Sequence, residues 1–236
     1  MNLLLSEMLK HEDPSQVEGL SHFFKTGPGE YGEGDLFLGI KVPITRSVVK
    51  DCWKGTSFED LEECLASGYH EVRLAGLLTL VEIFSHSRKD PLVQERCIGF
   101  YLAQTERINN WDLVDLSCYQ LLGSWLMYKD RSLLYDLARN GKSIWEQRIG
   151  IVSTMAFIRK GQLDDTFAIA DILLDHPHDL IHKATGWLLR EAGKRDGSAL
   201  REFLATRYMN MPRTMLRYAI EKFPEEERQQ YLKKKE

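Results

Sequence analysis

Apolar residues recur every three to four positions along most of the chain, a spacing that places them on one face of an α-helix. Helix-start signals separate these segments. Ser57-Phe58-Glu59-Asp60 has a capping-box pattern, and Asp90-Pro91 combines an N-cap residue with a proline at the first helical position. Apart from a short run at 37–42, no segment alternates apolar and polar residues as a strand does. We therefore predict an all-α protein.

The predicted helices come in pairs with a regular period. From residue 57 onward, first helices start near positions 57, 90, 130, 164 and 198, at separations of 33, 40, 34 and 34 residues. This period is typical of a helical-repeat solenoid, in which the second helix of each pair lines one concave surface. We expect a single repeat domain over 1–236, with one or two helices within 1–26 and a further helix that follows Pro43 and runs to Gly55.

A glycine-rich segment interrupts the pattern at residues 27–35. It contains a GxGxxG string at Gly27, Gly29 and Gly32, which in a dinucleotide-binding fold follows a strand and opens a helix. Here a helical segment precedes the string, more loop follows it, and two acidic residues lie inside it. A phosphate cradle is therefore disfavoured. We expect a mobile loop or a loop at the edge of a substrate site.

The composition predicts an ordinary globular protein without a membrane span. Apolar residues make up 43% of the chain and form no run long enough to cross a bilayer, and the N-terminal sequence does not resemble a signal peptide. We expect a cytoplasmic monomer. The cysteines, which include no CxxC pair, are expected to be reduced and mostly buried: Cys52, Cys64, Cys97 and Cys118.

Three histidines invite a metal site, but their setting argues against one. Pro177 interrupts the helical pattern among His176, His178 and His182, and no carboxylate–histidine framework surrounds them. We expect a loop and a helix start here, with neither a metal nor another cofactor.

The net charge of −4 conceals an asymmetry between the two halves of the chain. Residues 1–130 carry 12 basic and 20 acidic side chains, whereas residues 131–236 carry 19 basic and 15 acidic ones. Within 181–217 eight basic residues, Arg190 among them, accompany three acidic ones. Such an excess fits a phosphate-binding face, and it fits equally a set of solvated helix faces.

Equivalent positions on successive second helices carry an unusual set of side chains. One position, repeated at intervals of 38, 37 and 35 residues, holds Arg73, Trp111, Arg148 and Lys183. The position one turn later holds Leu77, Asp115, Val152 and Trp187. Cations, two indoles and one carboxylate are thus expected to converge on a concave basic groove. Phosphates can bind the cations while the indoles contact sugars or bases, so the groove suits a polyanion.

Several motifs resemble the AlkD-type bacterial alkylpurine DNA glycosylases, which have HEAT-like repeats. The motifs are Phe37-Leu38-Gly39-Ile40-Lys41-Val42-Pro43, Asn110-Trp111-Asp112-Leu113-Val114-Asp115, Trp145-Glu146-Gln147-Arg148 and Lys183 to Glu191. They occur in the family's order and cover the chain from about 37 to 223. The glycine-rich segment is longer than expected for the best-known members.

The resemblance implies hydrolytic removal of N3- and N7-alkylated purines from duplex DNA, without base flipping. Alkylation makes the base a cationic leaving group, and the sugar then passes through an oxocarbenium-like state. Asp115 is expected to stabilise that charge and to activate water, with Trp111 and Trp187 presenting π faces. Arg148 is expected to hold a backbone phosphate, a role we extend to the other candidate DNA-binding cations, Arg73, Lys183 and Arg190.

Other side chains near the motifs receive structural predictions. Asp112 points about 100° away from Trp111 on a helix, so we expect a cap or a salt-bridge partner. Trp125 is expected in the core, and Trp145, which shares a helix face with Arg148, is expected to pack or stack on it. Lys160 and Lys183 could in principle form a Schiff base, but nothing in their surroundings indicates a lowered pKa, which favours a monofunctional hydrolytic enzyme over a lyase.

The sequence also fits two other classes of function. A non-catalytic or differently specific DNA-binding relative would share the groove and its cations. A protein-interaction solenoid, a common role of helical repeats, predicts an apolar or acidic concave face instead.

Overall fold

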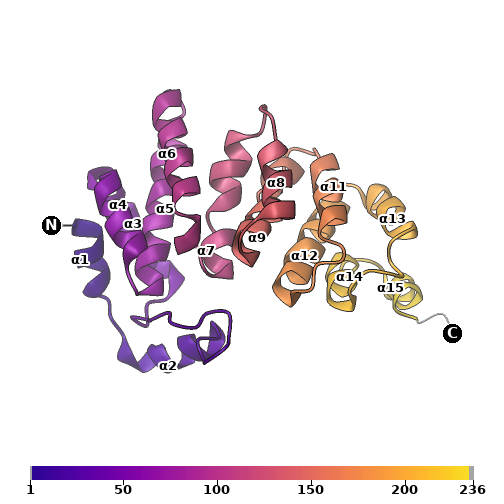
Figure 1. The fold of residues 1–236 in the computed structure, drawn as a ribbon, viewed down its shortest axis with the longest axis horizontal. Helices are drawn as coiled ribbons and strands as arrows, with labels where there is room; N and C mark the ends of the chain where they lie inside the picture. Colours follow the sequence, from indigo (N-terminus) through magenta and orange to yellow (C-terminus); the bar gives the residue numbers. More distant parts are fainter. Residues whose placement is uncertain (1, 234–236) are drawn as a thin grey trace. The chain divides into compact units, whose positions relative to one another are not determined.

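The computed structural model describes residues 2–233, and the regular elements within that range are helical, apart from an isolated bridge between Leu36 and Tyr69 (Figure 1). The predicted all-α class and the paired helices are confirmed. The chain forms two compact units, Met1–Leu121 and Leu122–Glu236, which are described in turn. In the described part of the chain, no helix is both long and apolar enough to span a membrane.

The first unit contains the helices that precede the repeats and the first two repeat pairs. Its α-helices are α1 (Leu3–Leu9), α2 (Pro14–Phe23), α3 (Val42–Cys52), α4 (Phe58–Ala66), α5 (His70–His86), α6 (Pro91–Ala103) and α7 (Trp111–Asp115). Short 3₁₀ turns cover Trp53–Gly55 and Thr105–Arg107. The predicted caps are present: Ser57 and Asp60 form a reciprocal capping box, and Asp90 caps α6.

α5 is the central helix of the first unit. It is buried along most of its 17 residues and packs against α3 and α4. Near its start the Glu71 carboxylate accepts the backbone N–H groups of Leu38, Gly39 and Ile40 at 2.9–3.1 Å. Gly39 has φ +86°, and a side chain there would collide with the Asp13 carbonyl. The Phe37–Pro43 motif therefore contains no strand: its backbone is held against α5 by Glu71, and its last two residues begin α3.

The second unit continues the helix pairs. Its α-helices are α8 (Ser132–Asn140), α9 (Ile144–Val152), α10 (Met155–Ile158), α11 (Asp164–Ile172), α12 (Asp179–Arg195), α13 (Gly197–Ala205), α14 (Arg213–Ala219) and α15 (Glu225–Leu232). A π-helical turn, Tyr119–Gly123, lies where the chain passes from the first unit into the second.

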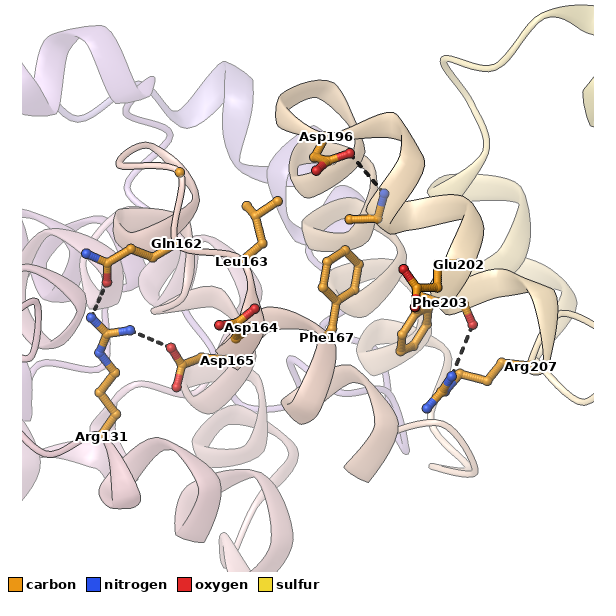
Figure 2. A pocket seen from close by; sticks show the side chains of 12 residues that line it. Arg131, Gln162, Leu163, Asp164, Asp165, Phe167, Asp196, Glu202, Phe203 and Arg207 are labelled. Atoms are coloured by element: carbon orange, nitrogen blue, oxygen red, sulfur yellow. Dashed lines mark hydrogen bonds and ion pairs between the residues drawn. The ribbon is translucent and has the colours of Figure 1, made fainter.

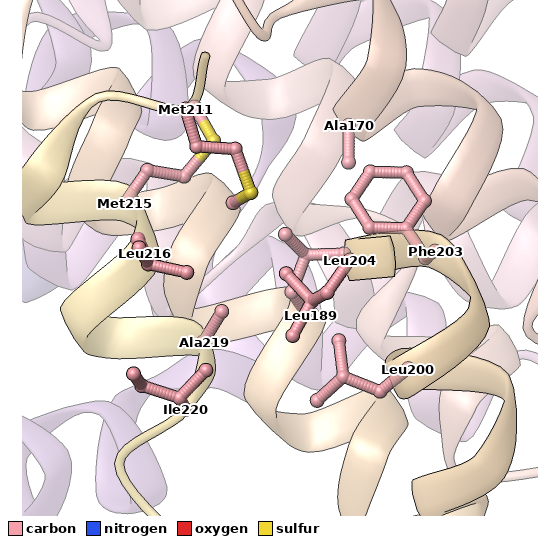
Figure 3. Packing of buried hydrophobic residues seen from close by; sticks show 10 residues of the cluster. All are labelled: Ala170, Leu189, Leu200, Phe203, Leu204, Met211, Met215, Leu216, Ala219 and Ile220. Atoms are coloured by element: carbon pink, nitrogen blue, oxygen red, sulfur yellow. The ribbon is translucent and has the colours of Figure 1, made fainter. Parts of the chain in front are cut away.

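The core of the second unit forms around α12. Leu189 packs there with Leu200 and Leu204 of α13 and with Met215 and Leu216 of α14 (Figure 3). Gly186 lets α14 approach closely, because a Cβ at this position would lie 2.5 Å from the Met215 carbonyl oxygen. Burial of this apolar surface fixes the helix from which the predicted Trp187 projects.

The four cysteines are buried and free, as predicted. Burial raises the pKa of Cys64 to about 11 and that of Cys97 to about 11. Their thiols are accordingly protonated and act as small apolar groups in the core.

Candidate active site

α7 carries the two residues at the centre of the predicted site. Asn110 caps the helix, and its side-chain oxygen accepts the Trp111 backbone N–H at 2.9 Å. Trp111 and Asp115 are half-buried, whereas the three residues between them are buried. Because positions four residues apart share a helix face, the accessible face of α7 presents the indole and the carboxylate together.

α7 is short because the backbone changes its hydrogen-bonding pattern after Asp115. The Ser117 hydroxyl donates to the Leu113 carbonyl at 2.5 Å, and the chain then widens into the π-helical turn. Inserted π turns of this kind occur often at functional sites, where they change the direction in which side chains project.

Trp111 lies on an aromatic platform formed by the end of α2. Phe24 stacks against one face of the indole, with ring centroids 5.3 Å apart and an interplanar angle of 17°. Phe23 meets the indole edge-on at 5.8 Å and is itself 59% exposed. Phe24 also packs against Phe37 and against the His70 imidazole, with ring centroids 5.2 Å and 4.6 Å apart, respectively. These contacts fix the indole and leave an exposed aromatic ring beside it.

A buried network of charged side chains lies beside this platform. The His70 Nδ1 atom is 3.2 Å from Asp35 Oδ2, and its Nε2 atom is 2.9 Å from Asp112 Oδ2. Asp35 Oδ1 also accepts from Arg73 at 2.7 Å and from Asn109 at 2.8 Å. The network joins the end of the glycine-rich segment, the start of α5 and the start of α7.

The geometry favours an imidazolium at His70. Each ring nitrogen faces a carboxylate oxygen, and a neutral imidazole has only one N–H to donate. Burial lowers the pKa of His70, but the hydrogen bonds to Asp112 and Asp35 outweigh burial and raise this pKa to about 9. For the Asp35 carboxyl, burial acts in the opposite direction and raises the pKa. The bond from His70, the charge of Arg73 and the bond from Asn109 together outweigh burial and bring the pKa of Asp35 below its usual value.

These contacts decide two of the predictions for the first unit. Asp112 is a salt-bridge partner, as predicted. Arg73 was expected to bind DNA, and the structure contradicts this expectation: it is 5% exposed and donates to Asp35 and, at 2.8 Å, to the Ser67 carbonyl. Its guanidinium stabilises the interior of the unit, so we no longer propose it as a phosphate contact.

The glycine-rich segment is organised by its own acidic side chains. The Gly27 N–H donates to Glu30 and the Gly29 N–H donates to Glu33, both at 2.9 Å. Carboxylates thus occupy the N–H groups that a phosphate cradle would need. A Cβ on Gly32 would lie 3.3 Å from the side-chain nitrogen of Asn110 and would collide with the Phe24 carbonyl. The segment therefore packs directly against the start of α7.

In the second unit, Trp187 lies half-buried on α12 and Arg148 lies on α9. The Arg148 side chain is 5% exposed, and its guanidinium donates to the Leu180 carbonyl at 2.5 Å. This contact ties α9 to the first turn of α12. Arg148 therefore has a structural role besides the phosphate contact predicted for it. The predicted meeting of Trp187 with the α7 pair stays a prediction.

Lys183 and Arg190 lie on α12 and pair with carboxylates at the surface. The Lys183 ammonium is 2.7 Å from Asp179, and its side chain is 41% exposed. Arg190 contacts Glu191 and Glu221. At these two positions of the predicted basic face, the cations are already paired with carboxylates. A DNA phosphate would have to replace those carboxylates in order to bind.

A cavity of 760 Å³ in the second unit contains more acidic than basic groups (Figure 2). Arg131 donates to Asp165 at 2.5 Å and also to Gln162. Arg207, at the other side of the cavity lining, pairs with Asp171. The four acidic residues that line the cavity are Asp164, Asp165, Asp196 and Glu202. Their charge disfavours DNA phosphates, so we do not place the DNA-binding surface here.

His176 and His178 precede α12, His182 lies within it, and all three use ring nitrogens in hydrogen bonds, including one of 2.9 Å between His176 Nε2 and the Gln147 side-chain oxygen on α9. His178 N–H donates to His176 Nδ1 at 3.0 Å, and Leu180 N–H donates to His178 Nδ1 at 3.1 Å. His182 bonds the His176 carbonyl. The predicted loop and helix start are present, and His178 is the cap of α12.

The two remaining tryptophans differ from each other. Trp145 is buried, at 8% exposed. Trp125 is half-buried, with the Lys129 ammonium 2.8 Å from its ring centroid, so the prediction that it belongs to the core is wrong. The apolar run around Trp125 did not reveal this lysine, which folds back onto the ring from four residues later.

The chain belongs to the DNA alkylation repair enzyme family, whose sequence profile matches residues 4–223. Among solved structures, it is similar to a predicted DNA alkylation repair enzyme from Enterococcus faecalis, with a TM-score of 0.69 and 16% identity. That similarity covers 91% of this chain and 98% of the other, and at this identity it supports the fold alone. Comparison with curated proteins gives no match. The family membership confirms the predicted resemblance and supports a role in repair of alkylated DNA.

Proposed function

We propose that this protein is a monofunctional DNA glycosylase that hydrolyses the N-glycosidic bond of N3- and N7-alkylated purines in duplex DNA. The observation that supports it most is the accessible face of α7, on which Trp111 and Asp115 lie one turn apart. Membership of a DNA alkylation repair family supplies the class of substrate. By the same family resemblance, the lesion stays in the duplex, and the enzyme acts as a cytoplasmic monomer without a cofactor.

The chemistry needs groups that stabilise positive charge at the sugar. An alkylated purine leaves as a neutral base, so no general acid is required, and the positive charge moves from the base onto the deoxyribose. The Asp115 carboxylate stabilises this charge and orients or deprotonates the attacking water. Trp111, held by Phe24, offers its remaining surface to the sugar and the cationic base.

Residues of α9 and α12 have supporting roles in the proposal. Trp187 supplies a second indole for the lesion, and Lys183 and Arg190 exchange their surface carboxylates for backbone phosphates. Arg148 holds a phosphate while it remains bonded to the Leu180 carbonyl. Each of these roles is separately testable by substitution.

The test is incubation of the purified protein with methylated duplex DNA, followed by identification of the released bases and of the DNA product. We expect free 3-methyladenine and 7-methylguanine, with abasic sites left in unbroken strands. Glu62→Gln is the control for loss of a single carboxylate, because Glu62 is exposed on α4. This variant should release the bases at the rate of the unmodified protein. DNA binding without release would contradict the proposal and would favour a non-catalytic DNA-binding protein.

A further inference from the structure

The buried charged network has no part in the proposed chemistry, yet it holds the helix that carries it. Asp35, His70 and Asp112 come from three segments separated by 35 and 42 residues. The His70 and Asp112 side chains are 1% and 5% exposed. A surface loop could hold the first turn of α7 only loosely, whereas this buried ion pair fixes it against α5.

The network is balanced only when His70 is charged. Asp35 and Asp112 contribute two negative charges, and Arg73 contributes one positive charge. A cationic His70 brings the sum to zero, and loss of its proton leaves an uncompensated carboxylate in the interior, which is strongly unfavourable. His70 is therefore the member whose state decides whether the network holds together.

His70 acts on α7 by two routes. One is the hydrogen bond to Asp112, the neighbour of Trp111, whose other carboxylate oxygen accepts the Leu113 N–H at 2.9 Å. The other is the stack of the imidazole on Phe24, which in turn lies against the face of Trp111. The first route fixes the backbone of α7 next to Trp111, and the second ends at the indole.

We propose that His70 is a positioning residue for base release, which as an imidazolium between Asp35 and Asp112 fixes the direction in which Trp111 and Asp115 face the lesion. The proposal rests on the proposed glycosylase function. It assigns His70 no contact with DNA, because the imidazole is buried behind the α7 residues it orients. The charged groups that face it are the two aspartates, with Arg73 bonded to the far side of Asp35.

The first test is His70→Gln, assayed under single-turnover conditions with saturating methylated duplex. Gln can donate to one carboxylate but cannot bridge two. Since a misplacement of about 1 Å can reduce a rate ~10²-fold, we expect the release rate to fall about 10²-fold with DNA affinity nearly unchanged. His86→Gln, at the exposed end of the same helix, is the matched control and should retain the full rate. An unchanged rate in His70→Gln would overturn the proposal.

The second test is Asp112→Asn, which keeps an acceptor for His70 and removes one of its two carboxylates. In the unmodified protein the release rate should fall as His70 loses its proton in the alkaline range. In Asp112→Asn the same fall should occur at lower pH, and the imidazole titration followed by NMR should move with it. A purely structural role would leave the pH profile in place. A profile that does not move would contradict the proposal, even if His70→Gln does not fold.

Amide hydrogen exchange separates this proposal from the proposed function. Residues 111–116 should exchange faster in His70→Gln, or in Asp112→Asn at alkaline pH, while amides of α12 keep their protection. This measurement does not depend on activity. If the unmodified protein releases no base, the glycosylase proposal fails. If the amides of α7 exchange at the same rate in all variants, the positioning role of His70 fails, whether or not the protein releases bases.

Discussion

Charged residues are used in opposite ways on α5 of the first unit and on α12 of the second. In the first unit, Arg73 and His70 are buried and bonded to fixed carboxylates. In the second, Lys183 and Arg190 pair with carboxylates near the solvent. Exposed pairs contribute about 0–1 kcal/mol and are screened by salt, whereas breaking a buried pair costs about 3–5 kcal/mol. A DNA phosphate can therefore replace the partners of α12 but not those of α5.

This difference explains why repeat alignment misassigned Arg73. Equivalent positions in successive helix pairs share a place along the helix, but not the same depth. At the start of α5, Asp35 arrives from the glycine-rich segment and draws the guanidinium inward. On α12, the equivalent Lys183 finds its partner one turn earlier on its own helix and stays near the solvent.

The largest stability effect is expected from breaking the buried network. His70→Gln leaves Asp112 without its cation, and we expect a loss of about 3–5 kcal/mol in the free energy of unfolding. Adding Asp112→Asn restores the charge balance, so the double variant should be more stable than His70→Gln alone. Chemical denaturation of both variants measures this coupling. Additive losses in the double variant would show that the two side chains do not act as a pair.

The next effect is a pH dependence of stability with a defined sign. The folded pKa of His70, about 9, lies above its ordinary value of 6.5. Its contribution is therefore complete below pH 6.5 and is lost as the pH rises through 9, a decrease of about 3 kcal/mol. Asp35, whose pKa is lowered, contributes only to acid unfolding. Urea denaturation across pH 6.5–9 should show the decrease in the unmodified protein and not in the double variant.

Arg148 is expected to combine both kinds of behaviour. Arg148→Ala removes a buried donor from the Leu180 carbonyl, which should lower the free energy of unfolding by about 1–3 kcal/mol. It should also weaken DNA binding and reduce the slope of log K against log salt by about one phosphate contact. Titrations at several salt concentrations measure that slope. A lower stability with an unchanged slope would restrict Arg148 to its structural role.

The smallest effect on stability is expected from Lys183→Ala and Arg190→Ala. Loss of a surface pair should change the free energy of unfolding by only about 0–1 kcal/mol, while DNA affinity decreases uniformly across sequences. Glu95→Gln, an exposed change on α6, serves as the control for a nonspecific change of charge. Intact DNA affinity in both lysine and arginine variants would place the phosphate contacts elsewhere.

The sequence predicted the parts of the structure that depend on local patterns. Helix pairs follow from capping residues and apolar periodicity, and the shared face of Trp111 and Asp115 follows from a separation of four residues. The network of Asp35, His70 and Asp112 could not be predicted in this way. Its members are distant in the sequence, and each alone is an ordinary polar residue in a loop or at a helix start.

The glycine-rich segment illustrates the same limit. Its composition predicted a loop, and the structure shows one that is closed by Glu30 and Glu33. Nothing in its composition indicated that Gly32 would lie beside Asn110 or that Asp35 would be buried between His70 and Asn109. Contacts of this kind arise only when distant segments meet in the folded chain.

The most direct measurement is the single-turnover release of 7-methylguanine by Asp115→Asn, with saturating duplex DNA. Asn is close to Asp in size and lacks the negative charge, so α7 should stay intact and DNA affinity should remain nearly unchanged. We expect the rate constant to fall about 10²–10⁴-fold, the range for loss of a catalytic base or of electrostatic stabilisation. A rate constant equal to that of the unmodified protein would contradict the assignment of the α7 carboxylate to catalysis.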